Sequence, residues 1–200
     1  GRTELMEAVI GLRPHLHGQV LAEGVALPSG DLAAGMAAGL AYLTKDRKGR
    51  GLLLNNTMTP NLTLQSLARH SRHGYLVPAS EAKAMERARR RFDIRARDPR
   101  IVVGRMSGGN QQKLLLAKVM EREPRIILID EPTRGIDVGT KQQIYNFISA
   151  LAADGAAVIV VSSEMPEVIG LCTKVAVMRE GRIVGQLEGD DITEHEIMRY

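Results

Sequence analysis

Aromatic residues are scarce in this 200-residue chain, which has four tyrosines, two phenylalanines and no tryptophan. Surfaces that stack the bases of single-stranded nucleic acid are built from such side chains, so a surface of that kind is not expected. The core must be built instead from aliphatic residues and methionine. The hydrophobic share of 44% and the charged share of 25% are ordinary for a folded protein and exclude a disordered chain.

Cysteine and long apolar runs are also nearly absent. The single cysteine, Cys172, rules out an intrachain disulfide and favours a reducing compartment. The apolar run 156–161 is far shorter than the roughly 18 to 20 residues that cross a bilayer. No basic segment followed by an apolar stretch opens the chain, as a secretory signal would require. A role at a membrane would therefore depend on a partner protein.

Short β-branched runs at 126–129 and 156–161 predict strands buried on both faces, as in a parallel sheet covered by helices. Between them, apolar residues recur at helical spacing over 138–153, which completes a strand–helix–strand unit. Glu180 and Gly181 lie between two further strand-like runs and predict a hairpin turn. The remaining expected elements are a helix at 4–10 and strands at 18–22, 39–43, 174–178 and 182–186.

The middle of the chain, 49–105, has no run typical of a buried strand and shows helical patterns at 61–70 and 80–92. It also carries a run of arginines. The run is compatible with a stripe that binds nucleic acid, but the exposed face of a helix is the favoured interpretation. The arginines concerned are Arg87, Arg89, Arg90, Arg91 and Arg100.

Two carboxylates, Asp130 and Glu131, follow the first predicted strand directly. In enzymes that transfer phosphate, the first such carboxylate holds Mg²⁺ and the second polarises the attacking water. The alternative is an acidic turn that caps the next helix.

A second motif, Ser107-Gly-Gly-Asn-Gln111, precedes a helical pattern at 112–120. A serine hydroxyl and bare backbone N–H groups at a helix N-terminus suit an anion, and the helix dipole adds to the attraction. Taken alone, the motif is also compatible with an ordinary serine N-cap. The two motifs in this order are more specific than either one.

Together, Ser107-Gly-Gly-Asn-Gln-Gln112 and Asp130-Glu-Pro-Thr-Arg-Gly-Ile-Asp137 resemble the signature motif, Walker B motif and D-loop of ABC-transporter ATPases. The residues after Glu131, with Val161-Ser-Ser-Glu-Met-Pro166, are similar to the ATP-binding subunits of bacterial monosaccharide importers. Those subunits carry two fused nucleotide-binding domains, and this chain resembles the second. The resemblance implies a P-loop NTPase fold, an α/β core with a mainly parallel sheet interrupted by a helical subdomain.

Three positions depart from the family pattern. Gly1, Arg2 and Thr3 match only the end of a Walker A loop, with arginine where lysine is usual, so the chain is expected to be truncated before the rest of that loop. The Q-loop glutamine corresponds to Lys45, and a cation cannot ligate a metal. The switch histidine corresponds to Ser163.

The resemblance also implies where the sites lie. Glu131 and Ser163 take the catalytic positions, while Thr3 and Asp130 are expected to bind Mg²⁺. The core is expected at 1–48 and 114–200 and the helical subdomain at 49–113. In this fold the strand before Walker A is expected beside 126–129, which would leave one side of that strand unpaired. The residues expected to contact ATP are Gly1, Arg2, Thr3, Lys45, Ser107, Gly108, Gly109, Asn110, Gln111 and Asp137.

The resemblance implies an asymmetric ATPase, because the signature is close to consensus while the Walker A, Q-loop and switch positions deviate. The domain's own ATP site is expected to be degenerate, and the chain alone inactive or very weak. Its signature would serve a second nucleotide-binding domain packed head to tail. The other implied partners are transmembrane permease subunits and, indirectly, a periplasmic sugar-binding protein, at the cytoplasmic face of the inner membrane and without nucleic acid. The alternatives are a soluble ABC ATPase that acts on nucleic acid or ribosomes, and a purely structural domain.

Overall fold

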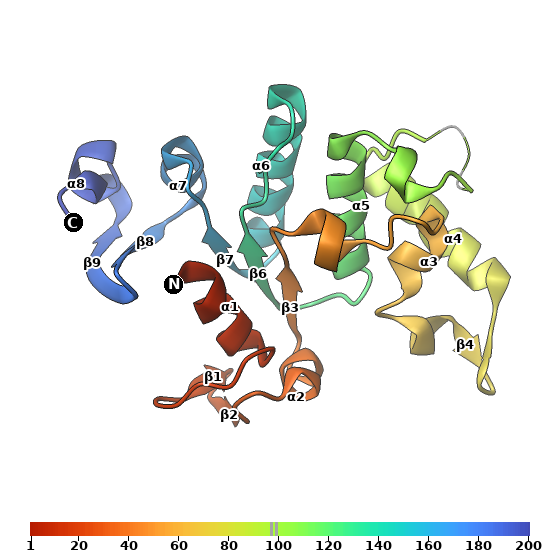
Figure 1. Ribbon diagram of the computed structural model, residues 1–200, viewed down its shortest axis with the longest axis horizontal. Coiled ribbons are helices and arrows are strands. Elements are labelled where there is room, and N and C mark those ends of the chain that lie inside the picture. The colour runs from red at the N-terminus through yellow and green to blue at the C-terminus, as the bar shows by residue number, and fades with distance from the viewer. Residues whose placement is uncertain (97, 99) are drawn as a thin grey trace. The chain divides into compact units, whose positions relative to one another are not determined.

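The computed structural model describes residues 1–96, 98 and 100–200, which form two compact units (Figure 1). The first unit comprises Gly1–Tyr42, Arg125–Pro132 and Tyr145–Tyr200. The second comprises Leu43–Pro124 and Thr133–Ile144. The predicted domains, with a core at 1–48 and 114–200 and a helical subdomain at 49–113, divide the chain at other places and stay a prediction.

A three-stranded sheet lies at the centre of the first unit, in the order β3 (Leu40–Leu43), β6 (Ile126–Asp130) and β7 (Ala157–Val161). Strands β6 and β7 are parallel, with Ile126 opposite Ala157, which confirms the predicted parallel pair. The expectation that one side of β6 would be unpaired is wrong, because β3 and β7 lie on its two sides.

The two parallel strands differ in burial. On β6, Ile127, Leu128 and Ile129 are at most 1% exposed, as predicted. On β7, Ile159 is 47% exposed and its neighbours are only partly buried, so the prediction of two buried faces is wrong for this strand. Strand β7 ends the order of the sheet, and the end strand of a sheet is covered by fewer neighbours than a central one.

Helix α1 (Arg2–Ile10) confirms the predicted helix at the start of the chain and contacts β6. Its buried side chains join a small aliphatic core with β3, β6 and the hairpin of β1 and β2. The helix ends at Gly11, whose φ of 88° is left-handed, and the next N–H groups return to carbonyls of the last turn. The core cluster consists of Met6, Ile10, Ala22, Leu40 and Leu128.

The C-terminal part of the first unit contains a hairpin around Glu180 and Gly181, whose φ values of 50° and 80° suit a tight turn. This confirms the predicted hairpin. Helix α6 (Val138–Ala153) also has its predicted bounds; it begins in the second unit and ends in the first. The other elements of the first unit are β1 (Val20–Ala22), β2 (Val25–Leu27), α2 (Leu32–Ala37), α7 (Met165–Leu171), β8 (Lys174–Arg179), β9 (Arg182–Glu188), η4 (Gly189–Asp191) and α8 (Glu194–Met198).

The second unit is mainly helical, as predicted for the middle of the chain. The predicted helix 61–70 is broken: α3 ends at Thr63, the Ser66 N–H closes a tighter turn onto the Thr63 carbonyl, and the separate turn η2 follows. A short hairpin turning at His73 and Gly74 was not expected from the sequence. The elements of the second unit are the π-helical turn η1 (Arg47–Gly51), α3 (Met58–Thr63), η2 (Leu67–His70), β4 (Ser71–Arg72), β5 (Tyr75–Leu76), α4 (Pro78–Arg91), η3 (Val103–Arg105) and α5 (Gly108–Met120).

No helix in the described part of the chain combines the length and the apolar character needed to cross a membrane.

Candidate functional site

The first candidate site is built around the buried carboxylate of Asp130, in the first unit. Asp130 ends β6 and is 1% exposed. Its Oδ2 accepts hydrogen bonds from the Thr3 hydroxyl at 2.9 Å and from the Tyr42 hydroxyl at 3.1 Å. The structure thus brings together Thr3 and Asp130, the two residues predicted to bind Mg²⁺. Tyr42, on β3, was not predicted to be part of the site.

This group of residues fits a magnesium ion. The other oxygen of Asp130, Oδ1, is buried and has no hydrogen-bond partner among the described residues. Within that part of the chain, no cluster of three His, Cys, Asp or Glu side chains is placed to hold a metal. Mg²⁺ does not need such a cluster, since it is bound through one or two carboxylates together with substrate phosphates and waters.

Arg2 stands where a Walker A lysine is expected, and its guanidinium is bound by the protein itself. Its Nη1 donates to the backbone carbonyl of Ser162 at 2.6 Å, just after β7. The Ser162 hydroxyl in turn donates to Glu167, which also accepts from the Tyr145 hydroxyl at 3.1 Å. Glu167 is 1% exposed, so this network fixes the segment after β7 from inside the unit.

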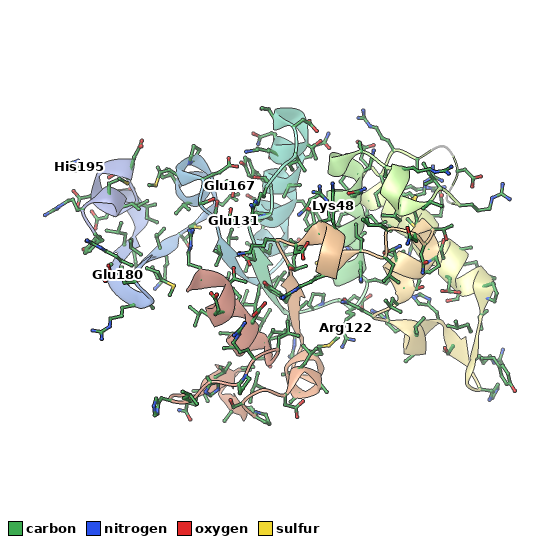
Figure 2. The ribbon with its side chains drawn as sticks, in the orientation of Figure 1. Lys48, Arg122, Glu131, Glu167, Glu180 and His195 are labelled. Carbon is green, nitrogen blue, oxygen red and sulfur yellow. The ribbon has the colours of Figure 1, made fainter. Side chains whose placement is uncertain are left out.

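Glu131 lies beside Ser163, the residue at the predicted switch-histidine position. One carboxylate oxygen of Glu131 accepts from the Ser163 hydroxyl at 3.0 Å and from its backbone N–H at 3.2 Å. Glu131 also has a φ of 50°, which is left-handed and rare for a residue with a side chain. Figure 2 labels Glu131 after β6 and Glu167 on α7. Glu131 and Ser163, the two residues predicted to be catalytic, are therefore in direct contact.

Burial raises the pKa of the Cys172 thiol, and the negative charge of Glu167 raises it further. A raised pKa lowers the thiolate fraction near neutral pH, and the thiolate is the reactive form. We expect iodoacetamide at pH 8 to alkylate Cys172 at least about tenfold more slowly in the folded chain than in the urea-unfolded chain. Mass spectrometry of timed samples gives both rates, and equal rates would show that the thiol is neither buried nor raised in pKa.

The second candidate site lies at the start of α5, in the second unit. Ser107 is the N-cap, and its hydroxyl accepts from the Asn110 backbone N–H and from the Asn110 side-chain amide at 3.0 Å. Gly108 and Gly109 form the first turn of the helix. The helix begins earlier than the predicted 112–120 because the serine cap ordered this turn. The predicted signature residues thus stand together at one helix N-terminus.

Asp137, the predicted D-loop residue, lies next to this turn. Its carboxylate accepts from the Thr140 backbone N–H at 2.9 Å and from the Thr140 hydroxyl at 2.8 Å. These hydrogen bonds, the backbone one first, lower the pKa of Asp137. Gly109 allows the close approach of this segment, because a Cβ on it would lie 2.7 Å from the Thr140 Oγ1.

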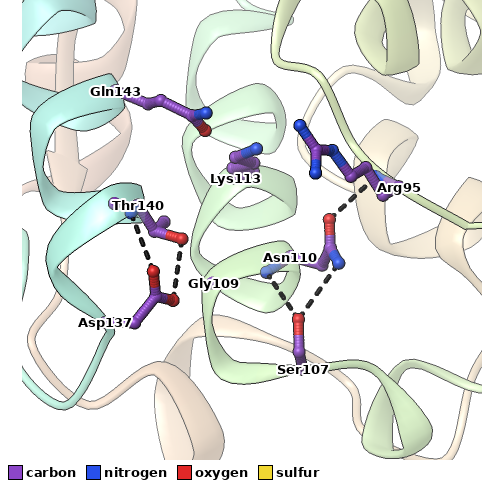
Figure 3. A pocket seen from close by; sticks show the side chains of 9 residues that line it. Arg95, Ser107, Gly109, Asn110, Lys113, Asp137, Thr140 and Gln143 are labelled. Atoms are coloured by element: carbon purple, nitrogen blue, oxygen red, sulfur yellow. Dashed lines mark hydrogen bonds between the residues drawn. The ribbon is translucent and has the colours of Figure 1, made fainter.

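An open pocket lies between the starts of α5 and α6 in this unit (Figure 3). Arg95 and Lys113 both form ion pairs with Asp93, Asp137 adds a negative charge, and amide and hydroxyl groups supply donors and acceptors. The N-terminus of α5 and these polar groups suit an anionic group. The lining residues are Arg95, Ser107, Gly109, Asn110, Lys113, Asp137, Gly139, Thr140 and Gln143.

Gln111 is turned inward, unlike its neighbours in the motif. It is 4% exposed, and its amide donates to the carbonyls of Val103 and Met106. Its oxygen accepts from Arg47 of η1, whose partial burial lowers the pKa of its guanidinium. The predicted contact of Gln111 with nucleotide stays a prediction, whereas its observed contacts hold the start of α5 in place.

The remaining predicted positions are found at the ends of elements. Lys45, the Q-loop position, is exposed between β3 and η1, and Gly1 is the N-cap of α1. Tyr42 and Thr140 were missed by the sequence analysis. The sequence holds a clue for Tyr42 alone: it lies at the end of an apolar strand, where a side chain faces the same edge of the sheet as Asp130.

A family model described as ABC transporter matches residues 1–134 of the chain. A ribose import ATP-binding protein, RbsA 2 of Agrobacterium fabrum, is 43% identical over 200 residues, which is 100% of this chain and 40% of that protein. An L-arabinose transport ATP-binding protein, AraG of Geobacillus stearothermophilus, is 40% identical over 201 residues, covering 100% of this chain and 39% of that protein. The chain thus spans about 40% of the length of these curated relatives.

Solved structures with the same fold include a nucleotide-free ATP-binding cassette from an ABC transporter, with a TM-score of 0.82. That likeness covers 99% of this chain and 80% of the other, at 18% identity. A dimeric ATP-binding cassette in a post-hydrolysis state, bound to ADP and Pi, gives a TM-score of 0.79 over 94% of this chain and 80% of the other, also at 18% identity. These likenesses confirm the predicted fold class.

Proposed function

Since the chain belongs to the ABC transporter family, we propose that it is an ATP-binding domain of a bacterial monosaccharide importer. It would couple the binding and hydrolysis of ATP to sugar uptake, as the second of two nucleotide-binding domains. The two relatives named above are described as import or transport proteins for ribose and L-arabinose, which supports a monosaccharide as the cargo.

The observation that carries the proposal is the hydrogen bond from the Thr3 hydroxyl to Asp130, because we propose both residues as ligands of Mg²⁺. Mg²⁺ bound there would neutralise charge on the phosphates of ATP. Thr3 and Asp130 would hold the ion. At the second candidate site, Ser107 and the first N–H groups of α5 would bind the phosphate of a partner domain's ATP.

The asymmetry of the proposal rests on the first candidate site. Arg2 is bound to the Ser162 carbonyl, so this guanidinium is held by the protein backbone. Serine replaces the switch histidine, and both of its donors hold the carboxylate of Glu131. We infer that this site hydrolyses ATP slowly, while the signature serves the site of a partner domain.

Replacing Glu131 with glutamine is expected to change steady-state ATP turnover of the assembled importer by no more than about threefold, or about 0.6 kcal/mol. The amide oxygen can still accept from Ser163, and the degenerate site contributes little of the flux. Phosphate release by the full-length protein with its permease gives the measurement. A loss of a hundredfold or more would show that this domain's own site is catalytic.

The partners we propose are a second nucleotide-binding domain packed head to tail, permease subunits and, indirectly, a periplasmic sugar-binding protein. With these partners, the chain would be bound at the cytoplasmic face of the inner membrane. Reconstitution in liposomes tests the proposal directly: ATP-dependent uptake of labelled ribose or arabinose is expected. Turnover that responds to ribosomes or RNA and not to sugar would favour the alternative class.

Three arginines of the run are paired with acidic side chains, which argues against the nucleic-acid alternative. Arg89 and Arg90 form ion pairs with Glu86 one turn earlier on α4, and Arg87 pairs with Glu121. Side chains engaged with neighbouring carboxylates are typical of a solvated helix face.

A further inference from the structure

Asp130 is a buried carboxylate whose two oxygens have different surroundings. Oδ2 accepts from two hydroxyl groups, while Oδ1 is buried without a hydrogen-bond partner among the described residues. No ion pair joins Asp130 to a cation in that part of the chain. A buried carboxylate with one bare oxygen is costly unless a cation or a donor approaches it.

Tyr42 and Thr3 hold the same oxygen from two different elements. Thr3 belongs to α1, and Tyr42 belongs to β3, which lies next to β6 in the sheet. The ring of Tyr42 is half-buried and packs against the aliphatic core cluster, so its hydroxyl is held in position by packing. Two fixed donors on Oδ2 restrict the rotation of the carboxylate and determine which oxygen stays bare.

We propose that Tyr42 is a positioning residue of the magnesium site: its hydroxyl fixes Oδ2 of Asp130, so that Oδ1 is the oxygen left for the ion or for a water bound to it. The inference rests on the proposed function, because it takes the ion from there. It assigns to the chain a residue that the signature, Walker and D-loop motifs do not contain. Groups that orient a metal ligand in this way commonly affect metal affinity by 10- to 100-fold.

Replacing Tyr42 with phenylalanine removes only the hydroxyl and keeps the ring in the core. We expect the affinity for Mn²⁺, used alone as a paramagnetic substitute for Mg²⁺ and measured by electron paramagnetic resonance, to fall about tenfold. Asp130→Asn identifies the component of Mn²⁺ binding that belongs to this site. Tyr75→Phe is the matched control, because Tyr75 is 79% exposed and lies in the second unit.

A second measurement does not depend on tight binding. With only four tyrosines in the chain, labelled tyrosine rings give a simple NMR spectrum, which the Tyr42→Phe spectrum assigns. Substoichiometric Mn²⁺ is expected to broaden the Tyr42 ring signals, and Asp130→Asn is expected to remove this broadening. In the Asp130→Asn background, Tyr42→Phe should have no further effect on Mn²⁺ binding, which a general loss of stability would not reproduce.

Three outcomes decide the matter. A tenfold loss confined to Tyr42→Phe, absent in the Asp130→Asn background, supports the positioning role. Mn²⁺ binding that Asp130→Asn abolishes and Tyr42→Phe leaves unchanged overturns the role of Tyr42 and leaves the proposed function intact. Mn²⁺ binding that is insensitive to Asp130→Asn overturns the metal site of the proposed function, and the role of Tyr42 with it.

Discussion

Replacing Gly108 with aspartate is expected to reduce ATP turnover of the assembled importer by at least about a hundredfold. The substitution places a carboxylate at the first turn of α5, where the phosphate of a partner's ATP is proposed to bind. Two unit charges about 4 Å apart repel by about 4 kcal/mol at an effective dielectric of about 20. Since about 1.4 kcal/mol corresponds to a tenfold change, a hundredfold loss allows for screening by solvent.

The fold is expected to tolerate this change. A Cβ on Gly108 would lie 3.4 Å from the Arg47 Nη2 and from the Gly135 carbonyl oxygen, which is ordinary contact. Gly108→Ala therefore tests the added volume and should cost turnover less than about tenfold, whereas Gly108→Asn has the size of aspartate without its charge. If Gly108→Asn is as damaging as Gly108→Asp, the loss comes from size and the electrostatic explanation is wrong.

Replacing Gly11 with alanine is expected to destabilise the first unit by about 3 kcal/mol or more. Gly11 has a φ of 88°, and a Cβ there would lie 2.5 Å from the carbonyl carbon and oxygen of Asp31. Backbone cannot move aside as a flexible side chain does, so α1 and the N-cap of α2 would have to separate. For a chain of this size the melting temperature should fall by about 6 to 12 °C, measured by circular dichroism.

Gly24→Ala is the matched control for this substitution. Gly24 has a similar φ of 80°, but no atom lies within 4 Å of the place where its Cβ would stand. It should therefore show the cost of the left-handed backbone alone, about 1 kcal/mol. Equal losses in the two variants would mean that the close approach of Gly11 to Asp31 contributes nothing.

The elements that the sequence predicts best are those with a strong local pattern. Strands β6 and β7 are continuous β-branched runs, and α6 has a regular apolar spacing bounded by a glycine, so local chemistry was enough to find them. The break after Thr63 depends on a turn in which the Ser66 N–H donates to the Thr63 carbonyl, and β4 and β5 have two residues each. Neither leaves a periodic pattern in the sequence.

The candidate sites divide in the same way. Motif spacing was enough to bring Ser107, Asp130 and Glu131 into view, because each stands at the end of a predicted element. Tyr42 and Thr140 were missed, since their roles depend on tertiary facts: that β3 lies beside β6, and that α6 begins against α5. Propensity and periodicity do not encode which elements become neighbours.

The close contact of Gly109 with Thr140 has a consequence for how sequences of this kind diverge. The three atoms nearest to a Cβ on Gly109 would all belong to the Thr140 side chain, at 2.7 to 3.3 Å. Replacing Gly109 with alanine would therefore require a smaller residue than threonine at 140. That second change would remove the hydrogen bond from the Thr140 hydroxyl to Asp137. Positions 109 and 140 are separate in the chain, but a side chain added at 109 would compete with the threonine at 140 for the same space.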